Sequence, residues 1–85
     1  MLYLIQDSTS KLIKIGISSN PEKRLKQLQT GSGSQLKLLR TFVTDNDRHW
    51  EKRLHKMLWQ TRKKGEWFDL NPLPDYLSLC DQLLL

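Results

Sequence analysis

The side chains with the greatest chemical potential in this sequence are a phenol, an ammonium, a guanidinium and a carboxylate: Tyr3, Lys14, Arg24 and Glu51. A guanidinium can bind phosphate oxygens through two parallel hydrogen bonds, and a carboxylate with several waters is a common Mg²⁺ site. Each residue also has a plain structural explanation, as a packing tyrosine or a solvated charge. None of them compels a function when taken singly, so the elements that position them decide whether they meet.

Two apolar runs near the N-terminus predict a β-hairpin. The runs are LYLIQD, residues 2–7, and KLIKIGIS, residues 11–18, and the DSTS segment between them supplies turn residues. Such a hairpin can bring Tyr3 and Lys14 to one face of a sheet.

The second run alternates strictly between two kinds of residue. Ile13, Ile15 and Ile17 share one side of the strand, and this side is expected to face the core. The other side consists of a charge, a glycine and a hydroxyl: Lys14, Gly16 and Ser18. That side is either merely solvated or the floor of a site.

The segment SNPEKRLKQLQTG predicts a helix over residues 21–30. Ser19 or Asn20 can cap it, proline suits its first turn, and Gly31 ends it. Arg24 then lies in the first turns of a helix that directly follows the second strand. The run LKLLRTFVT, residues 36–44, is rich in β-formers and predicts a third strand.

The longest helix is expected over residues 45–64, DNDRHWEKRLHKMLWQTRKK. A stripe at helical spacing is expected to face the core: Trp50, Leu54, Met57, Leu58 and Thr61. Glu51 and His55 are four residues apart, so they share a face of this helix, with Arg48 beside them.

The C-terminal third begins with KKGEWFDL, which predicts a break at Gly65 and then a short strand or an extended clip. PLPDYLSLCDQLLL predicts a helix that starts after Pro72 or Pro74. Its inward-facing residues are expected to be Leu77, Cys80, Leu83 and Leu84. The fold class is therefore α+β, a small antiparallel sheet flanked by helices, in a single domain over residues 1–85.

Composition narrows the class of partner. The 85 residues carry a net charge of +5, and the pI is near 9.6, which favours a polyanionic partner such as nucleic acid. One cysteine and two histidines cannot form a standard thiolate zinc site. The apolar runs are far shorter than a membrane span, so we expect an intracellular, cytoplasmic protein that does not contact a membrane.

The order of the polar residues resembles the GIY-YIG endonuclease superfamily, in particular its compact phage-associated branch with a KIG second motif. MLYLI corresponds to the first motif and KIGIS to the second, and three blocks follow in order: NPEKRLKQLQTGS, WEKRLHKML and GEWFDL. Met1 stands where the first glycine of the family would be, and the late asparagine of the family has no clear counterpart. The resemblance covers roughly residues 2–70.

This resemblance implies a three-stranded antiparallel sheet flanked by helices that cuts phosphodiester bonds in DNA with one Mg²⁺ or Mn²⁺ ion. It implies that Tyr3 positions or activates water, that Arg24 contacts the scissile phosphate and that Glu51 holds the metal. Lys14 takes the place of the second-motif tyrosine. A base must take a proton from the attacking water, and we expect this base to be either Tyr3 or Lys14. Both residue types keep their own proton at neutral pH, so either one needs cationic neighbours or burial to lose it first.

The remaining site residues are expected to contact the substrate: Gly16, Ser18, Arg48, Lys52 and His55. Gly16 is expected to allow a close approach to the backbone. The segment Glu66–Phe68 has two interpretations, a structural clip that closes the helix against the sheet or a position of Glu66 near the substrate.

Two other functions compete with the enzyme. The first is a catalytically inactive nucleic-acid-binding module, in which basic residues hold the phosphate backbone and Trp59 stacks on bases. Those basic residues are 48, 52, 53, 56, 62, 63 and 64. The second is a protein–protein adaptor that uses LSLCDQLLL. We expect a monomer, with a dimer through this leucine-rich helix as the alternative.

Overall fold

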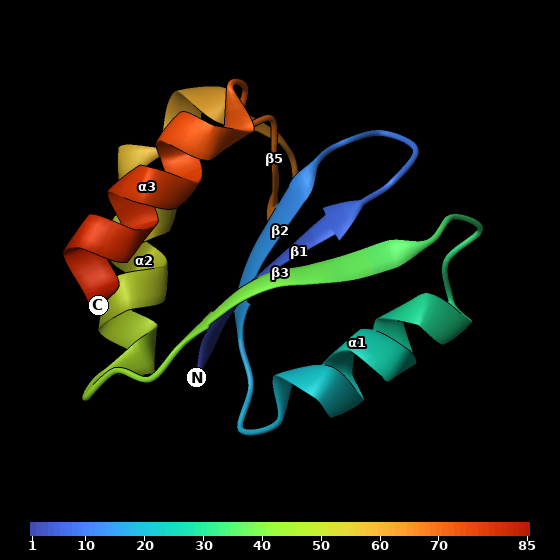
Figure 1. Ribbon diagram of the computed structural model, residues 1–85, viewed down its shortest axis with the longest axis horizontal. Coiled ribbons are helices and arrows are strands. Elements are labelled where there is room, and N and C mark those ends of the chain that lie inside the picture. Colours follow the sequence, from blue (N-terminus) through green and yellow to red (C-terminus); the bar gives the residue numbers. More distant parts are fainter.

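Five strands and three helices follow one another along the chain, and the computed structural model describes residues 1–85. The strands are β1 (Leu2–Asp7), β2 (Ile13–Ile17), β3 (Leu36–Phe42), β4 (Arg62–Lys64) and β5 (Trp67–Phe68). The helices are α1 (Pro21–Thr30), α2 (Asp47–Met57) and α3 (Leu73–Leu84). All strand pairs are antiparallel, in the order β3-β1-β2-β5-β4 (Figure 1). The predicted three-stranded sheet is therefore wrong, because β4 and β5 extend it.

β1 lies inside the sheet and pairs along both of its edges, with β2 and with β3. Its residues Leu2–Ile5 are all buried, since helices cover both faces of the sheet at this point. The turn that follows β1 is closed by Asp7, whose carboxylate accepts hydrogen bonds from the backbone N–H groups of Thr9 and Ser10 at 2.8 and 3.1 Å. These bonds fix the predicted hairpin.

The sheet divides the core into two layers, with α1 on one face and α2 and α3 on the other (Figure 1). The larger cluster includes Leu2, Leu4, Ile13 and Ile15, as strict alternation along the two strands requires. The smaller cluster, under α1, consists of Tyr3, Ile5 and Leu36 with partly buried neighbours. The prediction that isoleucines of β2 face the core is confirmed for Ile13 and Ile15, whereas Ile17 is only half-buried.

α1 begins and ends where the sequence indicates. Of the two possible caps, Asn20 is used: its side chain accepts a hydrogen bond from the Lys23 N–H at 3.2 Å. Pro21 occupies the first turn and is buried, and Gly31 follows the last residue. This helix carries Arg24 across the face of the sheet on which Tyr3 lies.

α2 is shorter than expected, because it ends at Met57 and not at Lys64. The chain then tightens into a 3₁₀ turn over Trp59–Thr61, where the Thr61 hydroxyl donates to the Leu58 carbonyl at 2.7 Å. The predicted core stripe is right for Leu54 and Leu58, which are buried, and wrong for Met57, whose side chain is exposed. Trp50 and Thr61 are half-buried.

The residues expected to finish that helix form a hairpin instead. Arg62–Lys64 pairs as β4 with β5, and Gly65 makes the turn with a φ of +53°, which glycine adopts at little cost. β5 in turn pairs with β2, which places Phe68 opposite Ile13 and buries it completely. Burial of this aromatic ring outweighs the helix-forming tendency of a basic run at a helix end.

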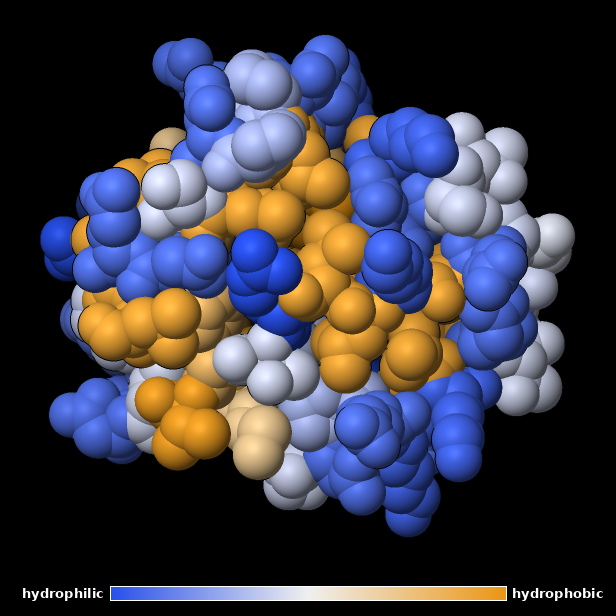
Figure 2. All heavy atoms as spheres, viewed as in Figure 1, coloured by the Kyte–Doolittle hydropathy of each residue, from blue (hydrophilic) through white to orange (hydrophobic).

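α3 begins at Leu73, after Pro72, and seals the larger cluster with the buried Cys80 and a set of partly buried side chains. That set is Leu73, Tyr76, Leu77, Leu83 and Leu84. Figure 2 shows apolar side chains across much of the middle of this face, interrupted by hydrophilic side chains, and hydrophilic side chains along most of the rim. None of the three helices has the length and apolar character that a bilayer span requires.

Candidate active site

A pocket of about 370 Å³ lies at the edge of β2 that β5 leaves uncovered. β5 pairs only with Ile13 and Lys14, so the end of β2 has no strand neighbour on that side. The pocket is lined from both sides of the sheet by a phenol, an aliphatic side chain, three cations and two carboxylates: Tyr3, Ile17, Arg24, Arg48, Glu51, Lys52 and Glu66. It is therefore a polar site shared by α1, α2 and the β4–β5 turn.

Tyr3 reaches the pocket by lying across Gly16. The two residues are direct partners in the β1–β2 register, and a Cβ at position 16 would lie 2.5 Å from the tyrosine hydroxyl oxygen. Only glycine leaves room for the ring, which is 2% exposed. No fully buried polar side-chain atom lacks a partner, so the Tyr3 hydroxyl, which forms no hydrogen bond within the chain, is accessible from the pocket that Tyr3 lines. The side of β2 that carries Gly16 is thus covered by the Tyr3 ring.

Three cations surround the space in front of Tyr3. Arg24 enters from α1, where its only side-chain partner is Gln27, at 3.4 Å. Arg48 and Lys52 enter from α2, one turn apart, and neither forms a salt bridge. Because all three cations lack a carboxylate partner, they are available to an anionic ligand.

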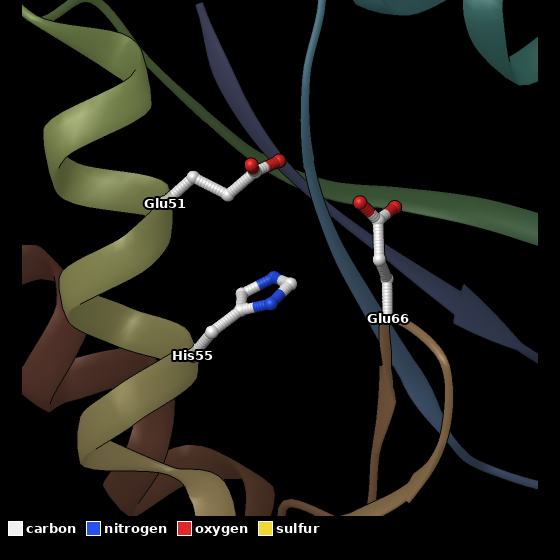
Figure 3. A group of neighbouring side chains, drawn as sticks. All are labelled: Glu51, His55 and Glu66. Atoms are coloured by element: carbon white, nitrogen blue, oxygen red, sulfur yellow. The ribbon is translucent and has the colours of Figure 1, made fainter.

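Figure 3 shows Glu51 and His55 extending from α2 towards Glu66, which rises from the β4–β5 turn. One donor atom from each side chain lies within 4.8 Å of the others. Burial raises the pKa of Glu51, and the negative charge of Glu66 raises it further, although His55, Arg48 and Lys14 oppose this. Two carboxylates facing each other in this way favour a cation between them.

His55 and Lys14 each make contacts that restrain their side chains beside the two carboxylates. The His55 Nε2 lies 2.9 Å from the carbonyl oxygen of Ile15, and its ring packs edge-on against Phe68 with the centroids 4.9 Å apart. Lys14 lies behind Glu66, with its Nζ 3.1 Å from Glu66 Oε2 and 5.5 Å from the Trp67 ring centroid.

The structure brings most of the predicted site residues together. Tyr3, Arg24 and Glu51 line one pocket, and so do Arg48 and Lys52. Their roles stay predictions, because position alone does not assign them.

The other predicted site residues do not line the pocket: Lys14, Gly16, Ser18 and His55. Lys14 does not line the pocket and contacts it only through Glu66. The Ser18 hydroxyl accepts a hydrogen bond from the Asn20 N–H at 3.0 Å and so belongs to the approach to α1. Gly16 is covered by Tyr3 and offers no open backbone.

The structure places the residues of the segment Glu66–Phe68 in two settings, and a contact of Glu66 with a substrate stays a prediction. Trp67 and Phe68 form β5, which lies between β2 and the edge strand β4, while Glu66 lines the pocket. Ile17 as a pocket wall was not anticipated from the sequence. Ile17 lies at the end of β2, beyond the residues that pair with β5, and is therefore open to the pocket. The sequence could not indicate this, because it depends on how short β5 is.

The model of one protein family, described as the T5orf172 domain, matches residues 1–82. No curated protein and no solved structure matches the chain. The matched family is distinct from the GIY-YIG endonucleases, so the resemblance drawn from MLYLI, KIGIS and the later blocks is wrong. The blocks are short, and the first two are degenerate, so they carry little family information.

Proposed function

The chain belongs to the T5orf172 domain family, and on that premise we propose that it is a metal-dependent endonuclease that hydrolyses phosphodiester bonds in DNA. The family is associated with nuclease-like and DNA-binding function. The observation that carries the proposal is the convergence of Tyr3, Arg24 and Glu51, which are far apart in sequence, on one polar pocket.

Arg24, Arg48 and Lys52 bind the scissile phosphate and its neighbours. They approach from opposite sides of the pocket, and no carboxylate competes for them. A guanidinium engages two phosphate oxygens at once and stabilises the negative charge that develops in the transition state. The +5 net charge of the whole chain adds general attraction to a polyanion.

Glu51 holds the divalent cation, which is Mg²⁺ or Mn²⁺. The donor chemistry fits, because the carboxylate is half-buried, lines the pocket and faces a second carboxylate. When bound, such an ion polarises a phosphoryl oxygen and stabilises the leaving oxygen.

Tyr3 positions the attacking water. After its hydroxyl has released its own proton to the solvent, the phenolate takes a proton from that water. Its ring is fixed by packing over Gly16, and its hydroxyl lines the pocket. Lys14 is the less suitable base because it is bound to Glu66 at 3.1 Å and does not line the pocket. Lys14 instead holds Glu66 in place.

A nucleic-acid-binding module without cleavage is the second candidate, and one surface favours it. The Trp59 side chain is 59% exposed, and the Arg62 guanidinium lies 4.8 Å from its ring centroid. Exposed basic residues continue from there along β4 as Lys63 and Lys64. An exposed ring beside cations is the arrangement that stacks on single-stranded bases.

Nicking of supercoiled plasmid with Mg²⁺ or Mn²⁺ separates the two candidates. The endonuclease proposal expects nicking by the unchanged chain, its loss in Glu51→Gln, and its retention in Glu22→Gln, the same substitution at an exposed residue outside this pocket. Salt-sensitive DNA binding without nicking in either metal would instead support the binding module.

We also propose that the chain is a monomer. The apolar side chains of α3 are used inside the molecule, since Leu73, Leu77 and Leu84 pack on the larger core cluster. Light scattering over a range of concentrations tests this, and a mass that doubles with concentration would support a dimer instead.

A further inference from the structure

We propose that Glu51, His55 and Glu66 together form one cation site that selects Mn²⁺ over Mg²⁺, an inference that deepens the proposed endonuclease function. Sequence reasoning gave Glu51 alone to the metal and His55 to the substrate. The structure offers three donors where one was expected, and one of them is a nitrogen.

The three donors come from two rigid elements. Glu51 and His55 are one helical turn apart on α2, and Glu66 projects from the tight turn between β4 and β5 (Figure 3). All three donor atoms lie within 4.8 Å of one another. Neighbouring ligands of an octahedral ion with bonds of about 2.1 Å are about 3.0 Å apart and opposite ligands about 4.2 Å apart, so side-chain rotation is needed to bring all three donors onto one ion.

His55 is held in the form that a metal ligand requires. Its Nε2 lies 2.9 Å from the Ile15 carbonyl oxygen, which can only accept, so Nε2 carries the proton. In the neutral ring the lone pair is then on Nδ1, so Nδ1 is the nitrogen that has to turn towards the two carboxylates to bind an ion. A metal-bound histidine typically donates its other N–H to a backbone carbonyl in this way, which fixes the tautomer and the ring orientation. The edge-on contact with Phe68 at 4.9 Å adds a second restraint.

The site holds a counter-charge when no ion is bound. The Lys14 Nζ lies 3.1 Å from Glu66 Oε2, and the Lys14 side chain is only 13% exposed. This ion pair uses one oxygen of Glu66 and leaves the other for a metal. Lys14 can therefore stay bound as a partner that orients a ligating carboxylate.

The donor set determines which ion is preferred. Mg²⁺ favours oxygen ligands and is reluctant to lose its waters, whereas Mn²⁺ also accepts an imidazole nitrogen and binds more tightly in the usual order of divalent metals. Three protein ligands leave about three positions of an octahedron for water and phosphate oxygens, which a nuclease needs.

Calorimetric titration of the metal-free chain with MnCl₂ and, separately, with MgCl₂ tests the site without DNA. We expect Mn²⁺ to bind at least about tenfold more tightly than Mg²⁺, and His55→Gln to weaken Mn²⁺ binding at least about tenfold while Mg²⁺ binding changes little. His49→Gln, at an exposed histidine of the same helix, is the matched control and should leave both affinities unchanged.

The opposite results would overturn the site: equal affinities for the two ions, or Mn²⁺ binding that survives His55→Gln. Circular dichroism checks that each variant folds. Should His55→Gln unfold, Glu66→Gln takes its place, because Glu66 lies in a turn, and Mn²⁺ binding unchanged in that variant would equally overturn the proposal.

The proposed function and this site fail separately. A chain that binds Mn²⁺ through His55 but never nicks DNA disproves the endonuclease and keeps the site. A chain that nicks DNA without any preference for Mn²⁺ disproves the three-ligand site and keeps the endonuclease.

Discussion

At the scale of single residues, the pocket depends on a tyrosine that fits only because its cross-strand partner is a glycine. Tyr3 is almost completely buried, yet it lines the pocket. It was predictable from the sequence that Tyr3 and Gly16 share a face of the sheet, since a short turn joins their two strands. It was not predictable that the Tyr3 ring lies over Gly16, because the alternation of KIGIS does not reveal which side chain fills the space above a glycine.

Gly16→Ala should move the Tyr3 ring, because a Cβ there would lie 2.5 Å from the hydroxyl oxygen. We expect a loss of stability of about 1–3 kcal/mol, as for other small-to-large changes in packed sites, together with a fall in nicking. Urea unfolding gives the first and plasmid nicking the second. Gly33→Ala is the control, since nothing lies within 4 Å of its Cβ. An unchanged stability in Gly16→Ala would contradict this packing.

Glu51 should make the fold less stable as the pH rises. Its pKa in the folded chain is raised above 4.5, chiefly by burial and then by Glu66. The unfolded chain therefore loses this proton at a lower pH than the folded chain, and stability falls as the pH rises from 4.5 through the raised value.

Replacement of Glu51 by glutamine removes this titration. In EDTA, Glu51→Gln should therefore be more stable than the unchanged chain at about pH 7, and the gain should shrink below about pH 4.5. Thermal unfolding at both pH values measures this, with Glu22→Gln as the control. A gain that is the same at both pH values would show that ionisation of Glu51 is not its source.

At the scale of elements, the site exists because α2 stops early and the chain turns back. The sequence indicated β1, β2, α1, β3 and the start of α2 correctly, since each has a clear period and clear ends. It failed at residues 58–64, where helical spacing and basic residues favour a continued helix. Pairing of β5 with β2 decided that segment, and such a long-range contact leaves no local pattern.

Gly65→Ala tests the importance of the β4–β5 turn. Gly65 has a φ of +53°, where a side chain costs about 1–2 kcal/mol. We expect a loss of stability of that size and weaker metal binding, because the adjacent Glu66 shifts with the turn. Unfolding curves and calorimetry measure the two effects, and Gly33→Ala again serves as the control. Metal binding that is unaffected in a destabilised Gly65→Ala chain would remove Glu66 from the site.

At the scale of the whole molecule, the pocket is shared by both layers of the fold. Arg24 comes from the layer of α1, and Glu51 comes from the layer of α2, so neither layer contains the site alone. The resemblance to the GIY-YIG endonucleases predicted that Tyr3, Arg24 and Glu51 lie together, although the chain belongs to a different family. The position of Glu66 beside Glu51 and His55 was not predictable, because it depends on the β4–β5 hairpin, which the sequence did not indicate.

The most direct test of the account is the single-turnover rate of plasmid nicking by Arg24→Ala, with its exposed neighbour variant Lys23→Ala as the control. If the pocket is where the phosphodiester bond is cut, Arg24→Ala should lower the rate by about 10²–10³-fold, as the loss of one donor to a transition-state anion does elsewhere. Lys23→Ala should stay within about twofold of the unchanged chain. Equal losses in both variants, or no nicking by the unchanged chain with either Mg²⁺ or Mn²⁺, would contradict the account.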